Sequence, residues 1–294
     1  MTPNPNRVWM SALAVAAGLT LVAAPPAGAV TSISSSGYGL GVNLTVLGFL
    51  PATLGPIASD SGSSPPGPYS GSNSVLSLNT TLGLGSALSP LGSLQVGTGV
   101  LTGSASSPFM SAPTGTGTGT VNNITSLNMV AALVKELGIT ATTISSTSNV
   151  SGAGSLQAYG STTIEDLVIS GTAVGSTITV GASGAVNPTV DDTIFDSGGL
   201  DIVLNMQVPT GANGPTSMAD GITTDALYID FTNFALGTGV LNGDVVVGES
   251  QAGILGSPVI PEPGTWALML VGFAGLGAAL RARRRTASAS AATQ

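Results

Sequence analysis

The segment Leu227-Tyr228-Ile229-Asp230-Phe231 alternates apolar and polar side chains. Successive side chains of a β-strand point to opposite faces of a sheet, so Leu227, Ile229 and Phe231 share one face, and Tyr228 and Asp230 share the other. A period of two with this composition predicts a strand that places one face in a core and the other face in water.

Short runs rich in Val, Ile, Leu and Thr recur along the chain and are separated by clusters of Gly, Ser, Pro and Asn. Many short strands with turn signals between them are typical of a β-sandwich or a barrel-like fold. We therefore predict an all-β body. The candidate strands are residues 38–47, 75–82, 93–101, 139–145, 162–169, 177–180, 200–208, 227–234 and 244–247.

Three stretches depart from this pattern. Apolar residues at helical spacing predict one short helix, packed on the sheet, between residues 127 and 137. The Ser-, Pro- and Gly-rich stretch 59–74 and the Gly-Thr repeat at 115–119 predict loops. No shift in composition divides residues 30–258, which favours one exported β-rich domain. The apolar positions of the expected helix are Leu127, Val130, Ala131, Val134 and Leu137.

The composition excludes most enzyme chemistry, because the chain has no Cys and no His. Without them there is no disulfide framework, no thiolate or imidazole metal ligand, and no thiol or Ser-His-Asp nucleophile. Carboxylate, hydroxyl and amide chemistry remain. No cofactor is expected, calcium excepted.

Charge is distributed unevenly. Residues 30–259 contain thirteen Asp or Glu and one Lys, Lys135, which leaves this body with a net charge of −12. Phosphate backbones and anionic lipid surfaces are recognised through clusters of Lys and Arg. The sequence therefore excludes nucleic acid as a ligand of the body, whereas divalent cations, or polymers bridged by them, stay compatible with it.

The N-terminus has the pattern of a secretory signal peptide. Arg7 precedes an apolar run at 8–24, and small residues follow in an Ala-x-Ala arrangement that ends at Ala27 and Ala29. We predict that residues 1–29 are removed by signal peptidase after Ala29. A retained anchor helix is the alternative, but Pro25 and Pro26 would end such a helix.

The C-terminus has a second targeting pattern. Pro261, Glu262 and Pro263 form an extended, accessible segment, because proline cannot continue a helix. An apolar stretch at 265–280 predicts a membrane helix, and the arginines after it predict the cytoplasmic side. Residues 286–294 are then a cytoplasmic tail and the body lies outside the cytoplasm. The arginines are Arg281, Arg283, Arg284 and Arg285.

Residues 259–285 resemble the PEP-CTERM sorting signal of Gram-negative bacteria, which joins Pro-Glu-Pro, a transmembrane helix and an Arg cluster in this order. The resemblance implies that an exosortase, an integral membrane cysteine transpeptidase, recognises Pro261, Glu262 and Pro263 and transfers the protein onward. It also implies anchoring in the inner membrane before processing, then display on the cell surface or release. A plain C-terminal anchor with a proline-rich stalk is the alternative.

Parts of the body are similar to the choice-of-anchor P family, whose members share a secreted body attached by differing C-terminal anchors. The similarity implies surface display and no defined chemistry. Many members of that family carry Cys in the body, and this chain has none. The residues concerned are 37–40, 144–148, 224–229 and 243–248.

One motif suggests catalysis. Asp196-Ser197-Gly198 follows Ile194-Phe195, and aspartic proteases place a catalytic Asp in an Asp-Thr/Ser-Gly turn after a hydrophobic strand. Asp60-Ser61-Gly62 is a second copy, and two carboxylates that share a proton could activate water without His. Asp60, however, lies in a low-complexity stretch, so a secreted aspartic-type hydrolase using Asp196 is only the alternative hypothesis.

The densest cluster of carboxylates comprises Asp191, Asp192, Asp196 and Asp201. Oxygen-rich loops suit calcium, and bound calcium would neutralise the clustered charge. Aspartates at strand ends more often cap turns by accepting hydrogen bonds from nearby amides. Both interpretations stay open.

These observations favour a non-catalytic structural protein of the cell envelope, extracellular matrix or biofilm, in contact with polysaccharide or another surface protein. Trp9 and Trp266 both lie in the targeting segments, so the body has only Tyr and Phe to stack on sugar rings.

Overall fold

The computed structural model describes residues 30–47, 51–65, 67–86, 89–109, 113–131, 134–152, 155–211, 214, 219–256, 269–278 and 281. Residues 269–278 and 281 are helical, and the other regular elements are strands. The strands are β1(Val30–Val46), β2(Ala52–Ile57), β3(Asp60–Ser64), β4(Tyr69–Val75), β5(Leu78–Ser86), β6(Ser89–Thr98), β7(Leu101–Ser107), β8(Thr114–Ala131), β9(Val134–Ser151), β10(Gln157–Glu165), β11(Leu167–Ser170), β12(Ile178–Val180), β13(Asp192–Ser197), β14(Leu200–Pro209), β15(Ala219–Leu236) and β16(Gly239–Gly256).

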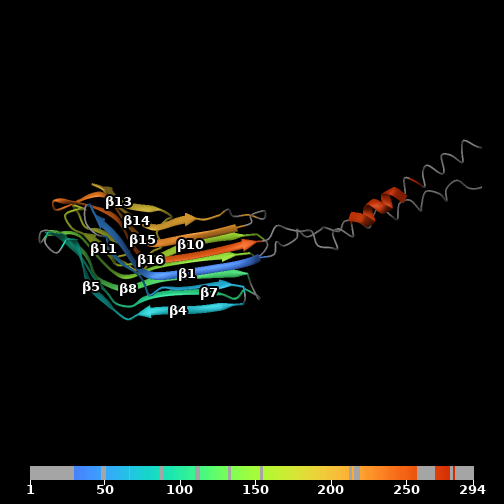
Figure 1. The fold of residues 1–294 in the computed structure, drawn as a ribbon, viewed down its shortest axis with the longest axis horizontal. Helices are drawn as coiled ribbons and strands as arrows, with labels where there is room; N and C mark the ends of the chain where they lie inside the picture. Colours follow the sequence, from blue (N-terminus) through green and yellow to red (C-terminus); the bar gives the residue numbers. More distant parts are fainter. Residues whose placement is uncertain are drawn as a thin grey trace, which may run out of the picture. The chain divides into compact units, whose positions relative to one another are not determined.

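The strands form two antiparallel sheets. The strand axes of one sheet are roughly aligned with those of the other (Figure 1). The first sheet has the order β13-β14-β15-β16-β1-β2, with β3 also paired to β1. The second has the order β12-β11-β9-β8-β6-β5, and β10, β7 and β4 extend it, with β10 on β9, β7 on β8 and β4 on β7. The inner faces of the two sheets pack on each other, so the all-β prediction is confirmed and the architecture is a sandwich.

The first and last strands of the body are neighbours. Val30 at the start of β1 is paired with Gly256 at the end of β16, and after a register shift between Val30 and Ser32 the two strands keep one register as far as Val46 and Leu241. The two ends of the body therefore emerge side by side at one end of the sandwich (Figure 1).

One half of the sandwich has a conventional hydrophobic core. Leucine, isoleucine, valine and phenylalanine from both sheets are buried there, and Phe231 and Phe234 make an edge-to-face ring contact with centroids 5.5 Å apart. Leu227, Ile229 and Phe231 are buried, while Tyr228 and Asp230 are only partly buried, as the alternation in this segment predicts. This hydrophobic core holds the long strands of the two sheets in place.

The other half of the sandwich combines glycine and buried hydroxyl side chains with a second, smaller hydrophobic cluster of Ile33, Val150, Leu156, Ala252 and Ile254. The inward positions of β8 include Gly117 and Gly119, and a Cβ on Gly117 would lie 2.2 Å from the carbonyl oxygen of Ser36 in β1. The buried Ser148 hydroxyl bonds to the Oγ1 of Thr224 at 2.9 Å and lies 3.0 Å from the Oγ of Ser250. Here the sheets approach backbone to backbone, because glycine leaves no side chain between them.

The change between the two halves is marked in β16 by a left-handed glycine. The inward positions are Leu241, Val245 and Val247 before Gly248, and Ser250, Ala252 and Ile254 after it. Gly248 has a φ of +69°, which only glycine adopts at low cost, and it shifts the inward positions by one residue.

The predicted loops at 59–74 and 115–119 are wrong in large part. Residues 60–64 and 69–74 lie in β3 and β4, and the Gly-Thr repeat lies inside β8. For the Gly-Thr repeat the physical reason is the close approach of the sheets, which requires glycine at alternate strand positions. Low complexity in this chain reflects a repeating strand environment.

The predicted helix at 127–137 is also wrong. Leu127, Met129 and Ala131 alternate on the buried face of β8, and Leu137 continues the buried face on β9. The two strands are paired as a hairpin, Ala131 with Val134. The helical spacing arose because the apolar residues belong to two consecutive strands, β8 and β9. Tertiary pairing overrode the local pattern.

Candidate functional site

The C-terminal targeting region contains the helical residues 269–278 and 281. Its large apolar side chains are all exposed, with Leu270 at 67%, Val271 at 68% and Phe273 at 65%. A helix that is apolar on every side is typical of a membrane environment. Within the described residues, however, no helix reaches the length and hydropathy that a membrane span requires.

Most residues of the two targeting patterns lie outside the described residues. This holds for the predicted cleavage residues Ala27 and Ala29, for the motif Pro261, Glu262 and Pro263, and for Arg283, Arg284 and Arg285. Arg281 is described and is helical. The signal peptide and the membrane helix therefore stay predictions from the sequence.

An acidic row crosses the outer face of the first sheet. Cross-strand pairing places Asp196 beside Asp201, Asp201 beside Asp230, and Asp230 beside Asp244, and Asn43 of β1 follows Asp244. Like charges directly opposite each other destabilise a sheet. Burial raises the pKa of Asp201, and the neighbouring charges of Asp196 and Asp230 raise it further. The row therefore concentrates negative potential on this face.

A second carboxylate pair lies closer to the middle of the same face. Asp225 is paired across strands with Glu249, and Glu249 with Tyr38, whose hydroxyl donates a hydrogen bond of 2.5 Å to Glu249 Oε2. Asp225 is only 4% exposed, and its buried Oδ1 has no hydrogen-bond partner. Burial, followed by the charges of Glu249 and Asp244, raises the pKa of Asp225 to about 7.

The four predicted calcium ligands do not form one cluster. Asp191 accepts a hydrogen bond of 2.8 Å from the backbone N–H of Gln207 in β14, sixteen residues further along the chain. Asp192 begins β13, and Asp196 and Asp201 are cross-strand neighbours in the acidic row. The described part of the chain contains no group of three or more carboxylates arranged to hold a metal ion. Calcium binding stays an untested prediction.

The structure separates the two Asp-Ser-Gly motifs. Asp60 lies in β3, which is paired with β1, and Asp196 lies in β13 at the opposite edge of the same sheet. Five strand spacings separate them, on the order of 24 Å. Two carboxylates at this distance cannot share a proton, so the paired-aspartate mechanism has no support in the fold.

The outer face of the second sheet has a different character. On five neighbouring strands, β4, β7, β8, β9 and β10, three consecutive cross-strand rows consist of Ser and Thr, with one Asn and one Tyr. We call these fifteen positions the hydroxyl face; none of them carries an ionisable group other than the Tyr phenol. The rows are Ser70-Ser106-Thr116-Asn149-Tyr159, Ser72-Ser104-Thr118-Thr147-Ser161 and Ser74-Thr102-Thr120-Ser145-Thr163.

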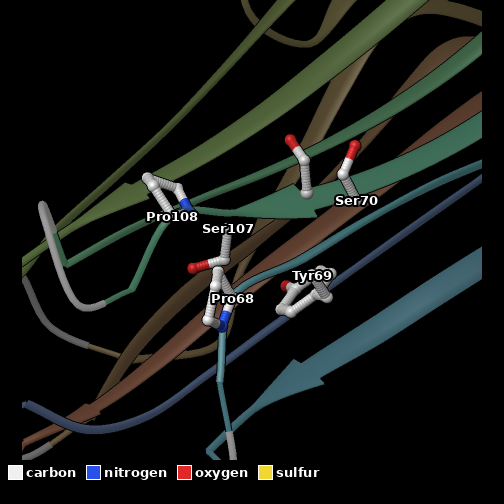
Figure 2. Close-up of a pocket in the computed structure, with 6 residues that line it drawn as sticks. Pro68, Tyr69, Ser70, Ser107 and Pro108 are labelled. Carbon is white, nitrogen blue, oxygen red and sulfur yellow. The ribbon is translucent and has the colours of Figure 1, made fainter.

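A hollow of about 420 Å³ lies where β4 begins and β7 ends. Figure 2 shows the rings of Pro68, Tyr69 and Pro108 around Ser107. Ser70 and Ser106, which begin the first row of the hydroxyl face, also line it. The Tyr69 hydroxyl lies 2.8 Å from Ser35 Oγ of β1, which holds the ring in place.

Sequence analysis missed both faces, although each left a signal. Asp225, Asp230, Asp244 and Glu249 all fall in strand-like segments, but only the cross-strand register brings them together. The Thr side chains of the Gly-Thr repeat alternate with period two, which is the strand period, and this signal was outweighed by the glycine content.

Comparison with known proteins identifies the tail. Residues 259–285 match the family model of the PEP-CTERM protein-sorting motif. No curated protein and no solved structure matches the chain. The class defined by these findings is an all-β protein that carries a PEP-CTERM sorting signal, and that signal implies export and membrane-associated sorting to the cell surface by an exosortase. The resemblance of the body to the choice-of-anchor P family stays a prediction.

Proposed function

We propose that this protein is a non-catalytic structural component of the cell envelope or extracellular matrix. Signal peptidase releases it from its leader, the C-terminal helix holds it in the inner membrane, and an exosortase-like transpeptidase cuts near Pro261, Glu262 and Pro263. The match of residues 259–285 to the sorting motif carries this proposal. The pairing of Val30 with Gly256 supports it, because both processed ends then leave the body together.

The proposed partners of the body are extracellular polysaccharide or another surface protein. The charge of the body supports this choice, because thirteen acidic residues against one lysine disfavour nucleic acid and anionic membranes. The outer face of one sheet carries the acidic row, and the outer face of the other carries the uncharged hydroxyl face. A protein with such faces is suited to contact neutral material on one side while staying soluble through charge on the other.

Fractionation of cells that express a Glu262→Ala variant tests the sorting step. We expect the wild-type protein in the surface or extracellular fraction, and the variant retained in the inner membrane at its unprocessed mass. Ser257→Ala, just before the motif, is the matched control and should behave as wild type. Identical distribution of wild type and Glu262→Ala would contradict exosortase sorting and favour a plain anchor.

The rival hypothesis, a hydrolase that uses Asp196, is tested separately. Purified protein and an Asp196→Asn variant are incubated with peptide and glycan substrates. We expect no turnover by either protein. Turnover by the wild type that is lost in Asp196→Asn would overturn the non-catalytic proposal.

A further inference from the structure

The hydroxyl face is a regular two-dimensional array. Neighbouring strands are about 4.8 Å apart and residues on one face of a strand repeat at about 6.8 Å, so five strands and three rows present their polar groups on an almost rectangular grid. The central row is Ser72, Ser104, Thr118, Thr147 and Ser161. Each hydroxyl both donates and accepts hydrogen bonds.

The array is held rigidly from behind. The residues between the outward threonines of β8 are Gly115, Gly117 and Gly119, and a Cβ on Gly119 would lie 2.1 Å from the carbonyl oxygen of Glu249 in the other sheet. Because the sheets meet backbone to backbone here, the hydroxyl face has little freedom to flex. Bonds within the face fix some side chains as well: Thr116 Oγ1 donates to Asn149 Oδ1 at 2.9 Å. Ordering these groups before binding lowers the entropic cost of association.

One exposed aromatic side chain terminates the first row. Tyr159, on the edge strand β10, has 57% of its surface exposed. At the other end of the row, Ser70 and Ser106 border the hollow, whereas Tyr69, which also lines it, points to the opposite side of β4 toward Ser35 (Figure 2). An aromatic ring presents an apolar face and a polar tip, which suits stacking on a sugar ring combined with hydrogen bonding.

Charge decides between the possible occupants. The fifteen positions of the hydroxyl face supply no ion pair to an anionic or cationic polymer, and the body that carries them has a net charge of −12. A second copy of this chain and a polyanionic polymer are both repelled by that charge, whereas a cationic polymer is drawn to the acidic row on the other sheet. An uncharged polymer rich in hydroxyl groups meets no such penalty.

We propose that the hydroxyl face binds a neutral polysaccharide, with Thr118 and Thr147 at its centre and Tyr159 stacking on a sugar ring. This inference rests on the proposed function, since it names the partner of the surface protein. It assigns one face of the sandwich to polysaccharide and leaves the acidic face toward solvent.

Binding to two polysaccharide fractions tests the proposal. The probes are the neutral and the acidic polysaccharides of the producing cells' own envelope, separated by anion exchange and each included in a native gel on which the full-length protein is run. The variants are Thr118→Val with Thr147→Val, which removes two hydroxyls while keeping β-branched side chains, and Tyr159→Ala. Thr45→Val, on an exposed position of β1 in the other sheet, is the control.

We expect the neutral fraction to retard the wild type and Thr45→Val equally, and each hydroxyl-face variant to bind about tenfold more weakly. Circular dichroism melts identify any variant that fails to fold. No retardation of the wild type by the neutral fraction, retardation by the acidic fraction alone, or unchanged binding in both variants would overturn the proposal. Self-association of the wild type that the double variant abolishes would assign the face to a second copy instead.

The failure of this inference and the failure of the proposed function are distinguishable. A wild-type protein that reaches the cell surface but binds no neutral polysaccharide contradicts only the role of the hydroxyl face. A protein that binds the polymer in the gel but is not sorted to the surface contradicts the proposed function.

Discussion

Asp225 is buried, and the cross-strand register of the first sheet places it beside other carboxylates, so that burial and their charges raise its pKa. Its carboxyl group is buried beside Glu249 and Asp244, and its pKa of about 7 compares with 3.8 for an unperturbed aspartate. Between these two values the folded state holds a proton that the unfolded chain has released. The free energy of unfolding must therefore fall as pH rises from about 4 to 7.

We predict that the protein is most stable at mildly acidic pH. Between pH 4 and 7, the titration of Asp225 alone lowers the free energy of unfolding by at most about 1.4 kcal/mol per pH unit. The raised pKa values of Glu249 and Asp244, both due first to burial, act in the same direction. Urea unfolding between pH 4 and 8 measures the effect. A free energy of unfolding that rises over this range would contradict it.

Asp225→Asn should flatten this pH dependence and raise the free energy of unfolding at pH 8, because an amide needs no proton to stay neutral. Asp192→Asn, at the start of β13, serves as the control and should keep the wild-type slope. Parallel curves for wild type and Asp225→Asn would show that Asp225 is not the titrating group.

Ser148 supports a second prediction at this scale. Its hydroxyl is fully buried and bonds to the Thr224 side chain at 2.9 Å and to the carbonyl oxygen of Ser250, also at 2.9 Å. Ser148→Ala leaves these partners unsatisfied and should cost about 1–3 kcal/mol of stability. Ser161→Ala, on an exposed outward position of β10, should change stability by less than about 0.5 kcal/mol. Equal stabilities of the two variants would rule out the buried hydroxyl network as a stabilising element.

At the scale of the strand, Gly117 tests the backbone-to-backbone packing of the sheets. Alanine in place of glycine in a strand is ordinarily favourable by roughly 0.5–1 kcal/mol. At Gly117, however, the new Cβ would lie 2.2 and 2.4 Å from the carbonyl oxygens of Ser36 and Gln251, so Gly117→Ala should destabilise by about 1–3 kcal/mol. Gly83→Ala in β5, where no atom lies within 4 Å, is the matched control and should be neutral or stabilising. A stable Gly117→Ala variant would mean that the sheets are farther apart than described.

Strand β8, which contains Gly117, also shows which strands could be predicted from the sequence and which could not. Segments such as Leu227 to Phe231 pack on large side chains, so their apolar and polar residues alternate and reveal the strand. In the first part of β8 the inward positions are Gly115, Gly117 and Gly119, and glycine signals a turn when it is considered locally. Its role depends on the backbone of β1 and β16, which lie far away in the sequence. The false helix at Leu127 to Leu137 has a similar cause, since the apolar residues belong to two consecutive strands, β8 and β9, that pair with each other.

At the scale of the whole molecule, the C-terminal sorting signal was predictable because it is a local sequence motif. The Pro-Glu-Pro motif, the apolar stretch and the arginines lie within 27 consecutive residues, and the family match covers the same range, 259–285. The acidic row and the hydroxyl face were not predictable, because each is assembled from four or five strands whose order in the sheet the sequence does not state.

The intact mass of the protein recovered from cells with and without the exosortase tests the central claim most directly. With the enzyme, we expect a chain that begins at Val30 and has lost the segment after the Pro-Glu-Pro motif, including the apolar stretch and the arginines. Without the enzyme, the chain should begin at Val30 and still end at Gln294. The same mass in both strains, with residues 265–294 intact, would contradict sorting through this signal.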